Sequence, residues 1–229
     1  MTDDAPATGG DPTSRSVDLR ADPDTPLDEV AAHLRAGGVI VYPTETVYGL
    51  GSACVPNGVA RVRDLKRRDP EKPLLALVES AAAIADLAWS DAARELARIF
   101  WPGAVTLVLA DPSRMFPPGV RDERTGAVGV RVSPHPLVIR LLDELGGPIT
   151  STSLNAPGGP PALSGHEAAR LVRELDGHHV WVLDAGTLPP SGPSTVVDCT
   201  GAEPVVIREG AVPVGRLRCA IPEIHERSI

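Results

Sequence analysis

This chain of 229 residues has few aromatic side chains, few cysteines and no long apolar run. Phe, Trp and Tyr make up only 3% of the residues, so the core must be built from valine, leucine, isoleucine and alanine. No run approaches the roughly 20 apolar residues that a membrane-spanning helix needs. The length and the 42% apolar content predict one well-cored globular domain without a membrane segment.

The three cysteines, Cys54, Cys199 and Cys219, are widely spaced and form no CxxC or Cys/His cluster. This spacing argues against a structural zinc site. The odd number of cysteines and the lack of a secretory signal favour a reducing compartment. We therefore expect a cytoplasmic protein.

Several familiar functional signatures are also missing. The formal charge of −8 argues against non-specific nucleic-acid binding, because phosphate contacts dominate that affinity, although a local basic patch remains compatible with it. Gly49-x-Gly51 is not a dinucleotide fingerprint, because Cys54 occupies the third glycine position. The sequence contains no Gly-x-Ser-x-Gly motif. It also contains no Walker A motif, so any ATP must bind to a site other than a P-loop.

The most informative stretch is residues 39–77. Residues 39–42 are apolar and predict a buried strand, which Pro43 ends because proline cannot donate to the ladder. Hydroxyl and acidic groups follow at residues 44–46, and the glycines of residues 48–51 would let a ligand approach the backbone. The pattern indicates a small-molecule pocket.

A short amphipathic helix and a cationic cluster follow within the same stretch. The predicted helix ends in Lys66, Arg67 and Arg68, just before a second apolar strand at residues 74–78. Hydroxyls and fixed cations thus stand on consecutive loops beside two strands. We interpret this arrangement as a site for an anionic ligand.

Strands alternate with helices along the rest of the chain, but without strict βαβ regularity near the end. This pattern predicts an α/β (α+β) fold with a twisted mixed sheet flanked by helices. The predicted helices are residues 28–36, 80–88, 90–100, 134–145 and 164–175. The further predicted strands are residues 106–110, 127–132, 149–153, 180–183, 194–199 and 204–208. We expect a disordered tail at residues 1–24, a catalytic domain at 25–212 and a loosely attached tail at 213–229.

Several short motifs resemble those of the YrdC/TsaC family of threonylcarbamoyl-AMP synthases. PTETVYGLG at residues 43–51 is followed by Lys66-x-Arg68 and by Lys72-Pro73-Leu74. Further similar segments are WPGAVTL at 101–107, VGVRV at 128–132, TSLN at 152–155, STVVD at 194–198 and IREG at 207–210. The ordered set covers roughly residues 27–212, and the chain resembles the short, single-domain form of the family.

The resemblance implies a nucleotide subsite. Its catalytic residues would be Lys66, Arg68, Ser153 and Asn155, which would also bind ATP together with Lys72 and Arg208. Fixed cations can offset the charge that builds up during adenylyl transfer. From the residues alone, a solvated helix end for the two cations and an ordinary turn for Ser153 and Asn155 remain alternatives.

The resemblance also implies an L-threonine subsite, formed by Thr44, Arg131, Ser151 and Ser194. Arg131 ends an apolar strand, where an unpaired guanidinium would be costly, so it must meet an anion. That anion is either an internal Asp or Glu or a ligand carboxylate or phosphate, and we favour the ligand. Thr44 alone is also compatible with an ordinary hydroxyl at a strand end.

The resemblance implies that L-threonine, bicarbonate and ATP react to give threonylcarbamoyl-AMP and pyrophosphate. Downstream proteins would then transfer the threonylcarbamoyl group to tRNA, with tRNA itself as a further candidate partner. Mg²⁺ is expected on the ATP phosphates, with Glu45 as a candidate contributor, but the sequence shows no metal-binding motif.

Two alternatives differ in class. A paralogue could act on another carbamoyl-type adenylate, because Leu154 and Pro157 depart from the TSAN pattern and from the serine that often follows it. The other alternative is an RNA-binding module, which the net charge disfavours.

Overall fold

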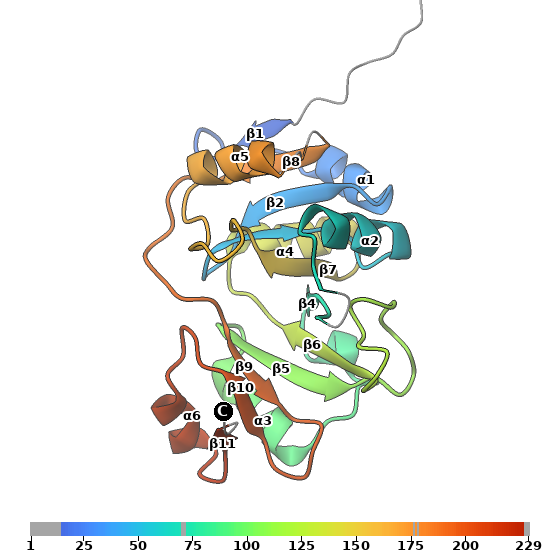
Figure 1. Ribbon diagram of the computed structural model, residues 1–229, viewed down its shortest axis with the longest axis vertical. Helices are drawn as coiled ribbons and strands as arrows, with labels where there is room; N and C mark the ends of the chain where they lie inside the picture. The colour runs from blue at the N-terminus through green and yellow to red at the C-terminus, as the bar shows by residue number, and fades with distance from the viewer. Residues whose placement is uncertain (1–14, 70–71, 176, 178, 227–229) are drawn as a thin grey trace, which may run out of the picture.

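The computed structural model describes residues 15–69, 72–175, 177 and 179–226. The strands of this part join in one 11-stranded mixed sheet with the order β1-β8-β2-β3-β7-β4-β6-β5-β9-β10-β11 (Figure 1). The strands are β1 (Ser16–Asp18), β2 (Val39–Pro43), β3 (Tyr48–Gly51), β4 (Leu75–Leu77), β5 (Val105–Ala110), β6 (Ala127–Arg131), β7 (Ile149–Ser153), β8 (Val180–Asp184), β9 (Thr195–Asp198), β10 (Val205–Arg208) and β11 (His225–Glu226). The helices are α1 (Asp28–Arg35), α2 (Pro56–Leu65), α3 (Asp91–Phe100), α4 (Pro136–Leu145), α5 (Gly165–Glu174) and α6 (Val214–Ala220), with a 3₁₀ turn η1 (Ala82–Ile84). This architecture confirms the predicted fold class.

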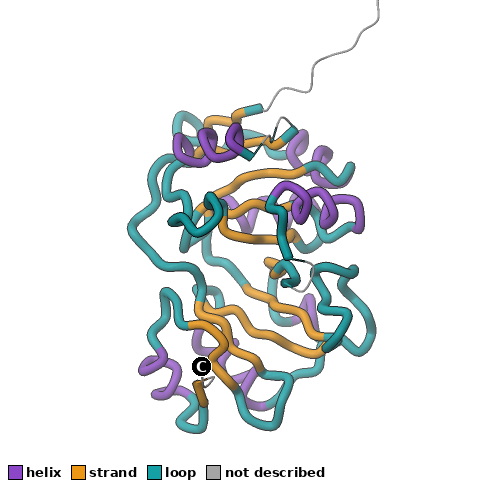
Figure 2. The backbone as a smooth tube through the Cα atoms, in the orientation of Figure 1, coloured by secondary structure: helices purple, strands orange, loops and turns teal. Residues whose placement is uncertain are grey.

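The sheet pairs segments that lie far apart in the sequence. β4 runs parallel to β6, with Leu77 opposite Arg131, and antiparallel to β7, with Leu75 opposite Ser151. β5 runs parallel to β9. The connection at residues 185–194 passes down one side of the molecule from β8 to β9 (Figure 2). Four of the motifs found in the sequence therefore meet on neighbouring strands.

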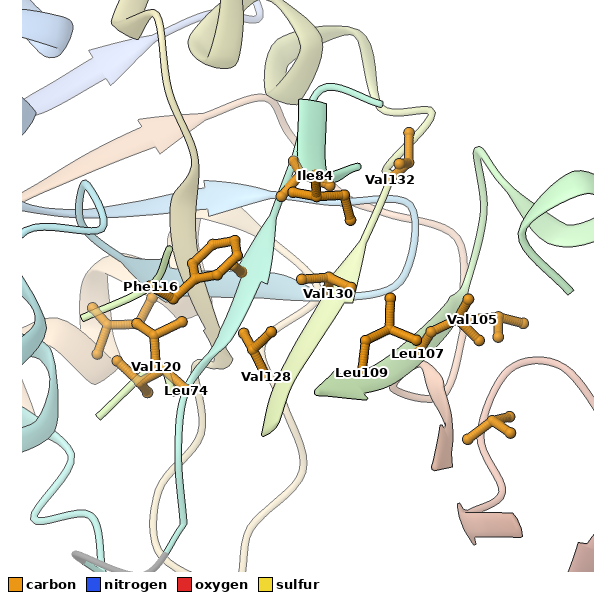
Figure 3. Close-up of a cluster of buried hydrophobic side chains, with 14 of the residues drawn as sticks. Leu74, Ile84, Val105, Leu107, Leu109, Phe116, Val120, Val128, Val130 and Val132 are labelled. Carbon is orange, nitrogen blue, oxygen red and sulfur yellow. The ribbon is translucent and has the colours of Figure 1, made fainter. Parts of the chain in front are cut away.

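Alternation along the strands gives the sheet two different faces. In β2, Val39 and Val41 belong to one buried apolar cluster, whereas Ile40 and Tyr42 belong to the other, because successive side chains point to opposite faces. The first cluster includes residues of α2, α3, α5 and α6, and Figure 3 shows its part on β5 and β6. The second includes residues of α1 and α4.

The helix boundaries show how local sequence decides each element. Ser164 caps α5 by accepting from the Glu167 backbone N–H, and the Glu167 carboxylate accepts from the Leu163 N–H, so two reciprocal bonds hold the start of the helix. Gly146, at φ 71°, ends α4 in the left-handed conformation that glycine adopts without strain. No helix among the described residues is long and apolar enough to cross a bilayer.

One local prediction is wrong. Residues 80–88 form only the short turn η1 rather than a helix, and the Ala88 backbone N–H bonds to the Ala110 carbonyl at the end of β5. The glycines of residues 48–51 lie in β3. A Cβ on Gly51 would overlap the Thr150 carbonyl oxygen, so this glycine permits the close approach of backbone to backbone.

The packed part of the chain extends beyond both predicted limits. Residues 16–18 form β1 beside β8, and Leu19 is buried, so the predicted disorder is wrong at these positions. At the other end, α6 buries Val214 and Leu217, and Ile224 is buried after it, so residues 213–226 are no loose tail. Residues 1–14 and 227–229 lie outside the described part of the chain.

Candidate active site

A cleft of about 520 Å³ lies over the half of the sheet formed by β3, β7, β4, β6, β5, β9 and β10. Successive side chains of a strand point to opposite faces of the sheet, so only every second residue faces the cleft. In β6, Val128 and Val130 face the core, so Gly129 and Arg131 face the cleft. Seven of the residues predicted from the sequence line this cleft: Thr44, Arg68, Arg131, Ser151, Ser153, Ser194 and Arg208. The sheet therefore brings together most of the predicted site.

Arg68 is held in place by three neutral acceptors. Its Nε donates to the Lys72 carbonyl at 2.7 Å, and Nη2 donates to the Pro73 carbonyl at 2.9 Å. Nη1 donates to the Thr152 hydroxyl at 3.1 Å. The guanidinium is thus fixed without an acidic partner among these bonds, and it keeps its full charge toward the cleft.

Lys66 and Asn155 form a second fixed group beside the cleft. The Lys66 ammonium donates to the Asn155 carbonyl at 3.0 Å and to Asn155 Oδ1 at 2.9 Å. The Ser153 hydroxyl donates to the same Oδ1 at 3.0 Å. The two motifs predicted to act together are therefore in direct contact, although Ser153 alone of these three lines the cleft.

Arg208 reaches the cleft from β10. Its Nη2 donates to the Ser194 carbonyl at 2.7 Å. The Ser194 hydroxyl is hydrogen-bonded to the Thr106 hydroxyl at 2.9 Å, and Thr106 is buried. Arg208, like Arg68, is held by neutral groups.

Arg131 is held differently, because it meets an acid. Its Nη1 lies 3.1 Å from Glu45 Oε1 and donates to the Thr46 hydroxyl at 3.4 Å. The other oxygen of Glu45 accepts from the Ser133 hydroxyl at 2.5 Å. The internal salt bridge that we ranked second is therefore present, and the same guanidinium also lines the cleft.

Thr44 organises the turn that carries Glu45. Its hydroxyl donates to the Val47 carbonyl at 2.8 Å, lies 2.9 Å from the Thr46 hydroxyl, and accepts from the Val47 backbone N–H at 3.2 Å. The three-residue turn is therefore rigid. It places Thr44 and Thr46 on the wall of the cleft.

The pKa shifts report burial and mutual repulsion of the cations in and beside the cleft. Burial lowers the pKa of Lys66, and the neighbouring Arg68 lowers it further. Burial also lowers the pKa of Arg68, with added repulsion from Arg63 and Arg208 that Asp69 partly offsets. The pKa of Arg208 is lowered by burial and by repulsion from Arg131. Like charges that repel one another in a half-buried cleft favour an anionic ligand.

Some predicted residues do not face the cleft. Lys72 is 71% exposed and lies 4.0 Å from Asp69, although its carbonyl accepts from Arg68. Leu154, a departure from the family pattern, is buried in the core, and Pro157, the other departure, is exposed. Neither departure alters the wall of the cleft.

Sequence reasoning did not single out four hydroxyls that line the cleft, those of Thr106, Thr125, Thr152 and Thr200, nor the charged groups of Asp122, Arg124 and Asp198. Thr106 stands between Val105 and Leu107, two residues of the apolar core, so strand alternation was the signal that could have identified it. Thr152 carries one of the hydrogen bonds to Arg68.

Metal ligands are not gathered in the described part of the chain, where no three His, Cys, Asp or Glu residues form a group that could hold an ion. Glu45, the candidate contributor, is engaged by Arg131 and Ser133. These residues do not fit a protein-built magnesium cage.

A cleft on a twisted mixed sheet, lined by four arginines (Arg68, Arg124, Arg131 and Arg208), two aspartates (Asp122 and Asp198) and several hydroxyls, defines an anion-binding site in an α/β protein. The family model Sua5_yciO_yrdC, described as "Telomere recombination", matches residues 32–210. The chain therefore belongs to the Sua5/YciO/YrdC family.

Individual relatives agree with this assignment. The chain is 41% identical over 189 residues to a putative threonylcarbamoyl-AMP synthase of Mycobacterium tuberculosis, covering 80% of this chain and 83% of that protein. It is 41% identical over 180 residues to the threonylcarbamoyl-AMP synthase of Stenotrophomonas maltophilia, covering 75% and 92%. The structure of P. abyssi Sua5 complexed with L-threonine superposes with a TM-score of 0.82 at 30% identity, covering 93% of this chain and 62% of that one.

Proposed function

We propose that this protein is a threonylcarbamoyl-AMP synthase that condenses L-threonine, bicarbonate and ATP to threonylcarbamoyl-AMP and pyrophosphate. The observation that carries the proposal is one cleft in which Arg68 and Arg208 stand beside the hydroxyls of Thr44, Ser151 and Ser194. The bacterial relatives above bear this name, and the P. abyssi protein was crystallised with L-threonine.

The nucleotide belongs beside the two arginines whose hydrogen bonds go to neutral groups. Arg68 and Arg208 line this part of the cleft, and Lys66 stands next to it, held by Asn155. Fixed cations stabilise negative charge without reorganising during the reaction, because hydrogen bonds already hold them in place. We assign the phosphates of ATP to this group, with Ser153 as a further donor.

The amino acid belongs beside Arg131. Thr44, Ser151 and Ser194 line the cleft around it and offer hydroxyls to a small polar ligand. The guanidinium offers two parallel donors, which suits a carboxylate. We assign the threonine carboxylate to Arg131 and the remaining polar groups of threonine to the hydroxyls.

The chemistry needs no covalent intermediate with the protein. The threonine amine loses a proton and joins the carbon of CO₂, or that of bicarbonate with loss of water, which yields a carbamate. A carbamate oxygen then attacks the α-phosphorus in line, and the bond to the bridging oxygen of the β-phosphate breaks, which releases pyrophosphate. Positioning and electrostatic stabilisation carry such a reaction.

The remaining assignments follow from this activity. Mg²⁺ is expected to arrive on the triphosphate, where it neutralises charge, because the described residues offer no cage for it. The product must pass to proteins that transfer the threonylcarbamoyl group to tRNA. A cytoplasmic location suits the free thiols of Cys54, Cys199 and Cys219.

The decisive experiment measures pyrophosphate release with purified protein, ATP, Mg²⁺, threonine and bicarbonate, leaving out one component at a time. We expect release only from the complete mixture. Release without threonine would instead point to another carbamoyl-type adenylate. No release from the complete mixture, with folding verified by circular dichroism, would contradict the proposal.

A further inference from the structure

Two non-glycine residues in the described part of the chain have a left-handed backbone: Arg67, with φ 44°, and Arg114, with φ 55°. Only a few per cent of non-glycine residues adopt this conformation, because the Cβ atom then crowds the following carbonyl oxygen. Such residues persist where their surroundings fix them, and they cluster at functional sites. Arg67 stands between Lys66 and Arg68, the two cations that we assign to the phosphates of ATP.

Backbone hydrogen bonds fix the left-handed turn at the end of α2. The Arg67 N–H donates to the Asp64 carbonyl at 2.9 Å. The Arg68 N–H donates to the Arg63 carbonyl at 3.0 Å. This pair of bonds forms a Schellman motif, which usually has glycine at the left-handed position. Here an exposed arginine occupies that position, so the turn is imposed by its surroundings and not by the preference of the residue.

The turn determines the direction of the two flanking cations. Residues two positions apart on a helix do not face each other, so a continuing helix would send Lys66 and Arg68 in different directions. In the structure both reach one segment. The Lys66 ammonium donates to Asn155 Oδ1 at 2.9 Å, and Arg68 Nη1 donates to the Thr152 hydroxyl at 3.1 Å. Thr152 lies in β7 and Asn155 shortly after it. The left-handed residue between the two cations is what lets them converge.

We propose that Arg67 is a positioning residue that acts through its backbone, whose left-handed conformation aims Lys66 and Arg68 at the phosphates of ATP. The inference rests on the proposed function and deepens it, because it explains how cations two positions apart serve one ligand. The Arg67 side chain takes no part in this role. A residue suited to the left-handed region can therefore replace arginine, whereas a residue that resists this region cannot.

A series of substitutions at position 67 separates the backbone from the side chain. Glycine adopts the left-handed conformation freely, asparagine tolerates it, and a β-branched residue resists it most. ATP affinity, measured by calorimetry, should therefore fall in the order Arg67→Gly, Arg67→Asn, Arg67→Ala, Arg67→Val. We expect at least about tenfold between the first and the last, since a misplacement of about 1 Å can cost about 100-fold. Threonine affinity should not follow this order, because threonine is assigned to Arg131.

Three results would contradict the proposal. Equal ATP affinities across the series would mean that the backbone conformation at position 67 has no effect on the cations. Equally large losses in Arg67→Gly and Arg67→Val would assign the effect to the side chain. Parallel losses of ATP and threonine affinity would indicate a general disturbance of the fold. Circular dichroism verifies folding, and if Arg67→Val does not fold, the comparison of Arg67→Ala with Arg67→Gly decides in the same way.

Arg114 provides the matched control, because it is the same residue type in the same backbone region but lies after β5 and outside the lining of the cleft. Arg114→Val should unfold at a lower urea concentration than Arg114→Gly, with the same ATP affinity in both. An equal ATP loss in Arg114→Val and Arg67→Val would refute a specific role of Arg67.

The binding series and pyrophosphate release fail independently. ATP binding needs neither threonine nor bicarbonate, so the series at position 67 still tests the turn if no pyrophosphate is released. Conversely, threonine-dependent release that is equal in Arg67→Gly and Arg67→Val would refute the role of Arg67 and leave the proposed function intact.

Discussion

The two ends of the cleft hold their arginines in different ways. Arg68 and Arg208 are fixed by carbonyl and hydroxyl oxygens, so their charge remains available. Arg131 lies 3.1 Å from Glu45, so its charge is matched within the protein. A polyanion suits the first arrangement better than the second. The contrast supports the proposed placement of the nucleotide beside Arg68 and Arg208 and of the amino acid beside Arg131.

The largest expected effect comes from removing charge at the nucleotide end. Arg68→Ala should reduce turnover at least tenfold and by as much as about 100-fold, the scale of losing one preorganised contact to developing charge. Lys66→Ala should likewise cost at least about tenfold. Pyrophosphate release at saturating ATP measures both. Exposed Arg94 lies outside the lining of the cleft, and Arg94→Ala provides the control. Unchanged turnover in both Arg68→Ala and Lys66→Ala would contradict the proposed phosphate-binding role of these cations.

The amino-acid end should respond in stability as well as in binding. Arg131→Ala leaves Glu45 buried without its counter-ion, which should lower the free energy of unfolding by about 3 kcal/mol. Arg208→Ala breaks no acidic contact of this kind and should cost less than about 1 kcal/mol. Urea denaturation compares the two. Equal losses would show that Glu45 does not distinguish the two arginines.

A smaller effect concerns pH. Burial and Arg68 lower the pKa of Lys66, so this ammonium loses its proton at a lower pH than a free lysine does. Because the charged form binds phosphate, ATP affinity should fall as pH rises through this lowered pKa. Lys66→Arg keeps its charge and should move the alkaline fall to higher pH. Calorimetric titration of ATP between pH 7 and 10.5 would reveal the shift, and coincident profiles would contradict the assignment.

The smallest effect is expected at the departures from the family pattern. Pro157→Ser should change neither turnover nor the KM for threonine, because Pro157 is exposed and lies outside the lining of the cleft. Leu154→Ala should lower the free energy of unfolding by about 2–5 kcal/mol, since Leu154 is fully buried, with the KM for threonine unchanged. A change in substrate preference in either variant would give this loop a role in specificity.

Most of the fold was predictable because its periodic elements are clear. The alternation of apolar residues in β5 and β6 and the N-cap at Ser164 each specify an element through local chemistry. β1 was missed because three residues carry too little periodicity. At residues 80–88 the predicted helix is absent, and the backbone of Ala88 instead bonds to the end of β5, a contact that local sequence does not predict.

Part of the candidate site was predictable from local sequence, and part depended on the folded chain. Residue types and motif order identified Thr44, Lys66, Arg68 and Arg131 as groups suited to an anion. Thr106 was missed although strand alternation places it opposite the core-facing Val105 and Leu107, because a single hydroxyl in a strand does not by itself indicate a ligand. The partner of Arg131 was equally hidden, since Glu45 and Arg131 are 86 positions apart and meet only through the pairing of β4 with β6 and β7.

The fold class, the lack of standard nucleotide motifs and the residues that could bind an anion follow from composition, periodicity and local spacing. Which cations face neutral groups and which meet an acid depends on the folded chain. That outcome depends on distances between side chains from strands remote in the chain, and on how far the sheet shields them from water.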